Sequence, residues 1–296
     1  MIAASFAIRP ATDIDRRKLV PALAARSIPS GGDLFIAFSP GTEALLGAGA
    51  VWFRPSRTFP EHAECHVHVG EAYRGIGIGR ALINHLTTRA REVGARELRT
   101  PPLEQGSASF GLALACGFQP TLPTITYEAP MESYIKAYTP VYERLVERGR
   151  MPAGARMIPL SEANRGEVCR LLIDHLGFPA RGTADRLRGT EQGFSQTISR
   201  VALLNGKMVG VILATYHGIM AAIEGTVVLP EHRHTWVASA LKYHIMNALI
   251  AQNVKRVQFS ASESQHRDTA NFGRRLPKAR VVKTVGTAVL DLCQPE

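Results

Sequence analysis

The stretch Val69-Gly-Glu-Ala-Tyr-Arg-Gly-Ile-Gly-Ile-Gly-Arg-Ala-Leu82 decides the fold of this chain. It follows a strand-like run and opens a helix-like run at 79–93, so a strand turns directly into a helix. Three alternate glycines, Gly75, Gly77 and Gly79, allow backbone dihedral angles that a Cβ would block. A helix N-terminus leaves N–H groups unpaired and carries partial positive charge. The stretch therefore predicts a binding site for a phosphate or a diphosphate.

Two common phosphate-binding loops do not fit this stretch. A Walker loop ends in Gly-Lys-Ser/Thr, whereas Gly79 is followed by Arg80 and alanine. A dinucleotide-binding loop has the order Gly-x-Gly-x-x-Gly, which is also absent. The pattern Arg74-x-x-Gly77-x-Gly79 after a strand resembles instead the coenzyme A diphosphate loop of the GCN5-related N-acetyltransferases, the GNAT superfamily.

The resemblance implies that acetyl-coenzyme A is a co-substrate held largely by backbone groups. In the family, the fourth strand hydrogen-bonds the pantetheine arm, and the N–H groups of the loop bind the diphosphate. Ser107 is the polar residue nearest to the position where the family usually carries an asparagine. The residues implied to bind the cofactor are Val67, Val69, Arg74, Gly75, Ile76, Gly77, Ile78, Gly79, Arg80 and Ser107.

The order of elements in the first half agrees with this resemblance. Apolar runs and turn residues predict strand, helix, hairpin, strand, loop, helix, strand, helix and strand. The first helix is expected to start at Thr12 or Asp13 and to run through Leu19 and Leu23, and the last strand is expected at 124–128. The resemblance implies an α/β fold with a mixed sheet, the acyl-CoA N-acyltransferase fold.

The second half of the chain repeats the first. A single shift of 159 residues places Val69 on Val228 and Arg74 on Arg233 without a gap. We therefore expect two tandem GNAT domains, in a layout similar to that of mycothiol synthases. The predicted boundaries are an N-terminal domain at 1–130, a helical linker at 131–154 and a C-terminal domain at 155–296.

The glycine loop is not preserved in the second copy. Gly75, Gly77 and Gly79 are replaced there by the residues His234, Trp236 and Ala238. We expect the indole to fill the space through which a diphosphate would approach the backbone. The N-terminal domain is thus expected to bind coenzyme A and to be catalytic. In mycothiol synthases the second domain is catalytic, so this chain departs from their pattern.

Three residues on the strand before the loop are candidates for the general base. Glu64, His66 and His68 are spaced by two, so a regular strand puts them on one face. The family often has Glu or His here, and such a base removes the proton of the attacking ammonium group. Family strands also carry a bulge that changes this alternation, so all three candidates remain open, with Glu64 placed first.

The acid that protonates the leaving thiolate is missing from its usual place. The family places a tyrosine four residues before the glycine of a terminal Gly-Phe pair, and here that position is Ala113. Water, Tyr127 or Tyr73 could supply the proton, and Cys116 lies near in sequence. The remaining interpretation is that the domain binds coenzyme A without efficient acetyl transfer.

Composition narrows the class of protein. The chain has 296 residues, with 35 Lys and Arg against 25 Asp and Glu, and this positive excess suits an anionic ligand such as coenzyme A. No basic run interleaved with aromatic residues suggests nucleic acid, and no apolar run is long enough to span a membrane. Four dispersed cysteines signal neither a metal site nor disulfides. We expect a cytoplasmic protein that needs no metal.

The sequence thus predicts an acetyl-CoA-dependent N-acetyltransferase that acts on the amine of a small molecule. A non-catalytic protein that binds coenzyme A or a partner, and a peptide or protein N-acetyltransferase, are the alternatives. The acceptor, the acyl group beyond acetyl and the oligomeric state, including a homodimer, are left open.

Overall fold

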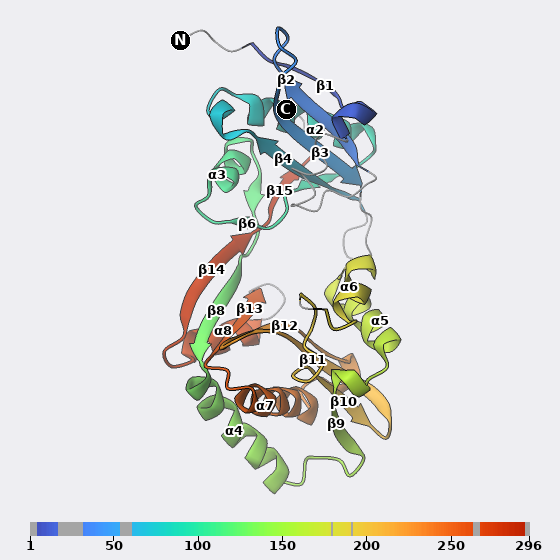
Figure 1. Ribbon diagram of the computed structural model, residues 1–296, viewed down its shortest axis with the longest axis vertical. Helices are drawn as coiled ribbons and strands as arrows, with labels where there is room; N and C mark the ends of the chain where they lie inside the picture. Colours follow the sequence, from blue (N-terminus) through green and yellow to red (C-terminus); the bar gives the residue numbers. More distant parts are fainter. Residues whose placement is uncertain are drawn as a thin grey trace. The chain divides into compact units, whose positions relative to one another are not determined.

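The computed structural model describes residues 5–16, 32–53, 61–178, 180–190, 192–262 and 267–293. Most of the expected first helix, including Leu19 and Leu23, lies outside these residues. The chain forms two compact units (Figure 1). The first unit comprises Met1–Pro123 and Thr284–Glu296, and the second comprises Thr124–Lys283.

The first unit is a mixed sheet with helices packed against it (Figure 1). Its strand order is β1-β2-β3-β4-β5-β15-β7, with β4 and β5 parallel. The strands are β1 (Ala7–Pro10), β2 (Asp33–Phe38), β3 (Leu45–Phe53), β4 (His62–Val69), β5 (Glu97–Arg99), β7 (Gln119–Pro120) and β15 (Ala288–Asp291). The helices are η1 (Glu71–Tyr73), α2 (Ile78–Glu92) and α3 (Ala108–Ala115).

Helix α2 covers one face of this sheet. Ile78, Leu82 and Leu86 recur at helical spacing and are almost completely buried. They pack against alternate residues of β4, such as Ala63 and Cys65, because those side chains point to the same face. Each fully buried leucine contributes about 1.5–3 kcal/mol to folding. This packing fixes the start of α2 beside the end of β4.

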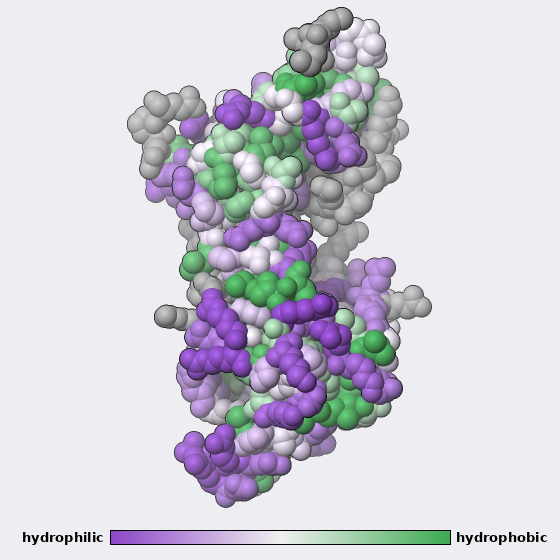
Figure 2. Space-filling view, turned by 90° about the vertical axis from the view of Figure 1, so that its left-hand side faces the viewer, coloured by the Kyte–Doolittle hydropathy of each residue, from purple (hydrophilic) through white to green (hydrophobic). Residues whose placement is uncertain are grey.

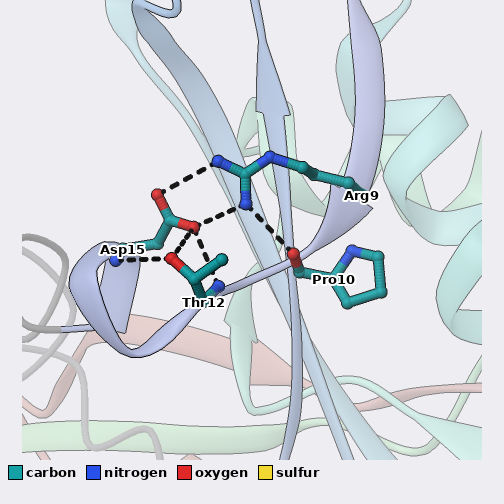
Figure 3. A network of polar contacts seen from close by, with 4 residues as sticks. All are labelled: Arg9, Pro10, Thr12 and Asp15. Carbon is teal, nitrogen blue, oxygen red and sulfur yellow. Dashed lines mark hydrogen bonds and ion pairs between the residues drawn. The ribbon is translucent and has the colours of Figure 1, made fainter.

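The start of the first helix is held by a compact polar network (Figure 3). Thr12 Oγ1 accepts a hydrogen bond from the Asp15 N–H at 3.3 Å, and the Asp15 carboxylate accepts one from the Thr12 N–H at 2.8 Å. Arg9 Nη1 donates to the same carboxylate at 2.6 Å. These contacts, chiefly the hydrogen bond from Arg9, lower the pKa of Asp15 to about 2. Thr12 is therefore the cap, one of the two residues expected for this position.

The second unit is also a mixed sheet, in the order β14-β8-β13-β12-β11-β10-β9. The strands are β8 (Thr124–Pro130), β9 (Ala155–Pro159), β10 (Arg200–Leu204), β11 (Lys207–His217), β12 (Met220–Val228), β13 (Arg256–Ser262) and β14 (Arg280–Gly286). The last three residues of β14 belong to the first unit, and the last two of them pair with β6 (Leu103–Glu104). The helices are α4 (Met131–Glu147), η2 (Leu160–Glu162), α5 (Arg165–Leu176), α6 (Ala180–Arg186), η3 (Pro230–His232), α7 (Trp236–Ala251) and α8 (Arg267–Arg275).

Helices cover both faces of the second sheet (Figure 1). On one face, α4 and α7 contribute Tyr134, Tyr138 and Leu241 to a large core. On the other face, α5 packs Val168 and Leu172 against β10, β11 and β12. The helix at 131–147 was expected to be a linker, but it is an integral part of the second unit.

The two units exchange their last strands. Strand β8 forms where the last strand of the first domain was predicted, yet it pairs with β13 of the second unit, Tyr127 opposite Phe259. Strand β15, near the end of the chain, pairs with β5 of the first unit, Leu290 opposite Leu98. The strand predicted at 124–128 is present as β8 but belongs to the second unit, because local pattern identifies a strand but not its neighbour. The units consequently differ from the contiguous ranges 1–130 and 155–296.

The internal repeat is reproduced in the elements. The turn η1 at 71–73 corresponds to η3 at 230–232, and the starts of β5 at Glu97 and β13 at Arg256 are also 159 residues apart. The same shift relates the starts of α3 and α8. Each unit therefore contains one copy of the strand, turn and helix that the sequence predicts.

Candidate functional site

The edge of β4 that faces β5 is only partly paired. It pairs with β3 over its whole length, from Ala63 opposite Phe53 to Val69 opposite Gly47. Its parallel pairing with β5 stops at Glu64, because β5 ends at Arg99. Within the described ranges, no strand continues this edge along residues 65–69. These backbone groups can therefore pair with an extended ligand, as they would with another strand.

Two glycines of the following loop adopt left-handed backbone conformations. Gly75 has φ = +84° and Gly77 has φ = +92°. A Cβ at either position would meet no described atom within 4 Å. The backbone conformation thus requires glycine, and the space beside the loop is open to a ligand.

Gly79 serves a different purpose. A Cβ built on it would lie 2.8 Å from Leu112 Cδ2 of α3 and 3.7 Å from Val69 Cγ2. Its small size therefore allows the start of α2 to pack closely against α3 and β4. The three glycines divide into two that shape the loop and one that permits packing.

The first turn of α2 presents free backbone donors. Ala81 N donates to Gly77 O at 3.1 Å, so the N–H groups of Ile78, Gly79 and Arg80 precede the first intrahelical bond. Gly77 is the N-cap and has no side chain to accept from them, and the first turn carries no acidic residue. An anion at this point would receive three N–H groups and the positive end of the helix dipole.

The remaining predicted cofactor residues lie around this turn. Arg74 Nε donates to Val69 O at 3.3 Å and ties the loop back to β4, while the Ile76 side chain is exposed. The side chains of Val67 and Val69 pack toward α2, so only their backbone can meet a ligand. Ser107 caps α3 and accepts from Phe110 N at 3.2 Å. The structure brings all of these residues except Ser107 to the end of β4.

The three candidate bases lie on the face of the sheet opposite α2. Glu64 faces Trp52 on β3, and His66 and His68 follow at two-residue steps. The pairing of β3 with β4 has no register shift, so their alternation is regular. Glu64 Oε1 lies 3.9 Å from His62 Nε2, and the His66 ring lies 5.0 Å from the Trp52 ring.

Two residues on this face were not among the predicted site residues. Arg99 stands beside Glu64 in the β4–β5 register, and its Nη2 contacts Glu97 Oε2 at 2.6 Å. Trp52 stands beside Glu64 on the other side. Only the pairing of the strands places them at the site, because both are far from the glycine loop in sequence.

The structure narrows the possible source of the thiolate proton. Ala113 lies on the buried side of α3 and has no hydroxyl that could give a proton. Tyr127 is 3% exposed and lies in the core of the second unit, so the suggestion that it reaches the site is wrong. Burial raises the pKa of the Cys116 thiol, which makes it a weaker acid and so a poorer proton donor to the thiolate. Tyr73 is partly exposed and its ring lies against Gly70.

The second copy of the loop is altered differently from what the sequence suggested. His234 keeps the left-handed conformation of Gly75, with φ = +61°. Trp236, however, is the first residue of α7 and only 5% exposed, since α7 begins one residue earlier than α2 under the repeat shift. The indole packs into the core of the second unit as part of α7, and that it blocks the ligand side of the loop stays a prediction.

Aromatic side chains of α4 join the elements that flank the second loop. The Tyr138 ring lies 4.8 Å from the Phe272 ring of α8, and the Tyr134 ring lies 6.1 Å from the Phe259 ring of β13. Lys242 Nζ of α7 lies 5.0 Å from the centre of the Tyr138 ring. The side chains of α4 thus contact α7, α8 and β13 together, where the first unit has no corresponding helix among its described residues.

Strand β12 contains a bulge at the second copy of the base region. The register with β11 shifts between Leu213 and Ala214, which leaves Glu224 as the extra residue. Its carboxylate accepts from Thr215 Oγ1 at 3.0 Å and contacts Arg186 Nη2 at 3.3 Å. The bulge expected from the family therefore occurs in the second unit and not in the β3–β4 pairing of the first.

The described residues contain neither a metal site nor a membrane-spanning helix. No group of three or more His, Cys, Asp and Glu side chains there could hold a metal ion. None of the helices in the described ranges combines the length and apolar character needed to cross a bilayer.

Comparisons with known proteins agree with the fold. The model of the Acetyltransferase (GNAT) family matches residues 8–118 and 172–276. A tandem GNAT protein from the clavulanic acid biosynthesis pathway, solved without AcCoA, has 16% identity and a TM-score of 0.59 over 99% of this chain and 100% of its own. A GCN5-related N-acetyltransferase from Sphaerobacter thermophilus has 13% identity and a TM-score of 0.57 over 98% and 96%.

A third structure, a GCN5-related N-acetyltransferase from Anabaena variabilis, has 16% identity and a TM-score of 0.61 over 97% of this chain and 73% of its own. At such identities these likenesses show a shared tandem fold alone. The search of curated proteins returns no match.

Proposed function

Because the chain belongs to the acetyltransferase (GNAT) family, we propose that its first unit transfers an acetyl group from acetyl-coenzyme A to the amine of a small molecule. The observation that carries this proposal is the open N-terminus of α2 beside Gly75 and Gly77. It lies at the end of β4, whose edge toward β5 is unpaired beyond Glu64 among the described residues. A diphosphate and an extended pantetheine arm match these two features in order.

The backbone supplies binding and orientation in this scheme. The N–H groups of Ile78, Gly79 and Arg80 hold the diphosphate, and the side chains of Arg74 and Arg80 add positive charge. The free edge of β4 at 65–69 holds the pantetheine arm and places the thioester beside the strand. An N–H on this edge stabilises the oxyanion that forms when the amine attacks the thioester carbonyl.

The side chains on the opposite face act on protons. Glu64, His66 or His68 accepts the ammonium proton, directly or through water, so that the free amine can attack. Neutral histidine suits this role near pH 7. Because position 113 has no hydroxyl, water or Tyr73 protonates the departing thiolate. The second unit supports the fold and binds no coenzyme A, since α4 packs its tyrosines between α7 and α8.

The test compares two glycines with the same backbone requirement. Gly77 (φ = +92°) and Gly94 (φ = +81°) lie at opposite ends of α2, and a Cβ on either meets no described atom. Alanine at either site adds a similar strain of about 1–2 kcal/mol. We expect Gly77→Ala to weaken coenzyme A binding by about tenfold or more, because strain there moves the N–H groups that hold the diphosphate.

Gly94→Ala should leave the affinity unchanged at a similar loss of thermal stability. Isothermal titration calorimetry with coenzyme A measures both effects. Equal affinities of the two variants would overturn the proposed site.

A second candidate function is binding of coenzyme A without transfer, and the buried Ala113 favours it. Thiol release from acetyl-coenzyme A, measured with a panel of amines and peptide N-termini, separates the two. Transfer predicts release that depends on an amine, whereas tight coenzyme A binding without release with any acceptor favours the second candidate.

A further inference from the structure

The end of α8 and the start of β14 form a strongly basic surface on the second unit. The stretch 274–283 reads Arg-Arg-Leu-Pro-Lys-Ala-Arg-Val-Val-Lys and contains no acidic residue. Its cations are all exposed, namely Arg274, Arg275, Lys278, Arg280 and Lys283. We call this stretch the basic edge.

Two of the described carboxylates near the basic edge, Glu128 and Glu132, are already paired. Glu128 on β8 is buried and accepts from Arg280 Nη2 at 2.8 Å and also from Arg256. Glu132 on α4 accepts from Lys136 Nζ at 2.6 Å. The positive charge of the basic edge therefore exceeds what its neighbours neutralise, and an acidic partner would be attracted to it.

The backbone of β14 offers hydrogen-bonding groups on the side away from β8. Thr284 O accepts from Gln105 N at 3.0 Å on that side. Alternate residues of a strand direct their backbone groups to the same edge, so Val282 and Arg280 present their N–H and C=O groups there as well. The pairing with β6 covers only Val285 and Gly286, and in the described part of the chain no strand extends it along 280–283.

Two apolar side chains are exposed on this edge. Val281 is 56% exposed and Val282 is 38% exposed. Figure 2, which faces the β14 side of the molecule, shows an apolar area bordered by hydrophilic side chains at the level of β14. The cations of the basic edge disfavour pairing with another neutral or basic strand, whereas an acidic strand would be attracted to them and could bury the two exposed valines.

We propose that β14 receives an extended, acidic segment of a partner protein as an added strand. The backbone groups of Arg280 and Val282 would pair with the segment, the valines would bury its apolar side chains, and the cations would meet its carboxylates. Nucleic acid fits less well, because phosphates do not use a strand edge and the stretch has no aromatic residue for stacking. A second copy also fits less well, because it would bring the five cations of one basic edge next to the five cations of another.

The experiment measures binding of labelled probes to the full chain by fluorescence polarisation. The probes are a peptide of alternating glutamate and valine, a peptide of alternating lysine and valine, and a single-stranded oligonucleotide of the same charge as the acidic peptide. We expect the acidic peptide to bind at least about tenfold more tightly than the other two, with an affinity that falls as salt rises.

Matched variants separate strand addition from charge alone. Val282→Pro removes the outward N–H, whereas Val282→Thr keeps it, so only the first should weaken the acidic peptide by about tenfold. The double variant Lys278→Glu, Lys283→Glu should weaken it comparably. Coenzyme A binding by the first unit and thermal melting serve as controls for folding, and they do not depend on this surface.

Hydrogen exchange on the unmodified chain gives a measurement that needs no variant. The acidic peptide must protect the amides of Arg280 and Val282, and their unchanged exchange would overturn the proposal. Absence of binding would also overturn it. So would tighter binding of the oligonucleotide, binding that Val282→Pro leaves intact in a folded protein, or a dimer that Val282→Pro dissolves.

Discussion

The two copies of the strand, loop and helix, at 69–82 and 228–241, have the same order of elements, but their side chains have different roles. In the first copy, Gly77 caps α2 with a left-handed backbone and leaves the helix donors open. In the second, Trp236 starts the helix and anchors it in the core. The difference indicates that one fold accommodates both a loop that leaves its helix donors open and a loop whose helix begins with a buried side chain, with all three glycines of the first loop replaced in the second.

The largest expected effect is on kcat, where substitutions of the candidate bases on β4 and of Glu224 on β12 should differ. Replacing the operative base among Glu64, His66 and His68 with glutamine should lower kcat by about 10²–10⁴-fold, because proton removal from the ammonium group is lost. Glu224→Gln on β12 should leave kcat within about twofold, since the proposal assigns no proton transfer to the second unit. Steady-state thiol release measures both. A larger effect at Glu224 than at any of the three would reverse the assignment of the units.

The indole of the second copy should matter for stability and not for binding. Trp236→Ala removes a nearly fully buried side chain and should cost about 3–5 kcal/mol of unfolding free energy. It should create no second coenzyme A site, because α4 still fills the space between α7 and α8. Urea unfolding measures the change in unfolding free energy, and calorimetry measures the number of coenzyme A molecules bound per chain. Two coenzyme A molecules bound per chain would show that Trp236 does block the loop.

The helix caps of the two units should respond differently to acid. Asp15 in the first unit has a pKa lowered to about 2 by Arg9 and Thr12, so its contribution is complete above pH about 4 and is lost as the pH falls toward 2. Asn164 caps α5 in the second unit by accepting from Gly166 N and Glu167 N, and it does not titrate. The protection factors against hydrogen exchange, which correct for the intrinsic rate at each pH, should therefore fall at Thr12–Arg16 in this range and stay constant at 164–168.

The variant Asp15→Asn should remove this difference and cost about 1 kcal/mol at neutral pH, the usual value of a helix cap. Acid sensitivity of the first cap that persists in Asp15→Asn would assign the titration to another group.

The sequence predicted correctly those structural features that depend on a few adjacent residues. The glycine stretch specified where β4 ends and α2 begins, because left-handed turns and helix starts depend on a few adjacent residues. The shift of 159 residues located the second copy, including η3 and α8. The amphipathic run at 131–150 was recognised as a helix, but its tyrosines identified neither its core position nor its contacts with α7 and α8.

The features that sequence reasoning missed depend on contacts between distant residues. The partners of β8 and β15 follow from the assembly of whole sheets, not from the residues of either strand. The burial of Trp236 follows from a helix start that differs by one residue between the copies. Arg99 joins the site only through its register with Glu64.

The placement of β15 has a consequence for biosynthesis. The first sheet lacks Ala288–Asp291 until the ribosome has made all of the second unit, so the first unit cannot be completed before the second unit has been translated. Leu98, which β15 covers, remains without its partner Leu290 for that period. A stop codon shortly before Ala288 would therefore damage the half of the protein that was synthesised first.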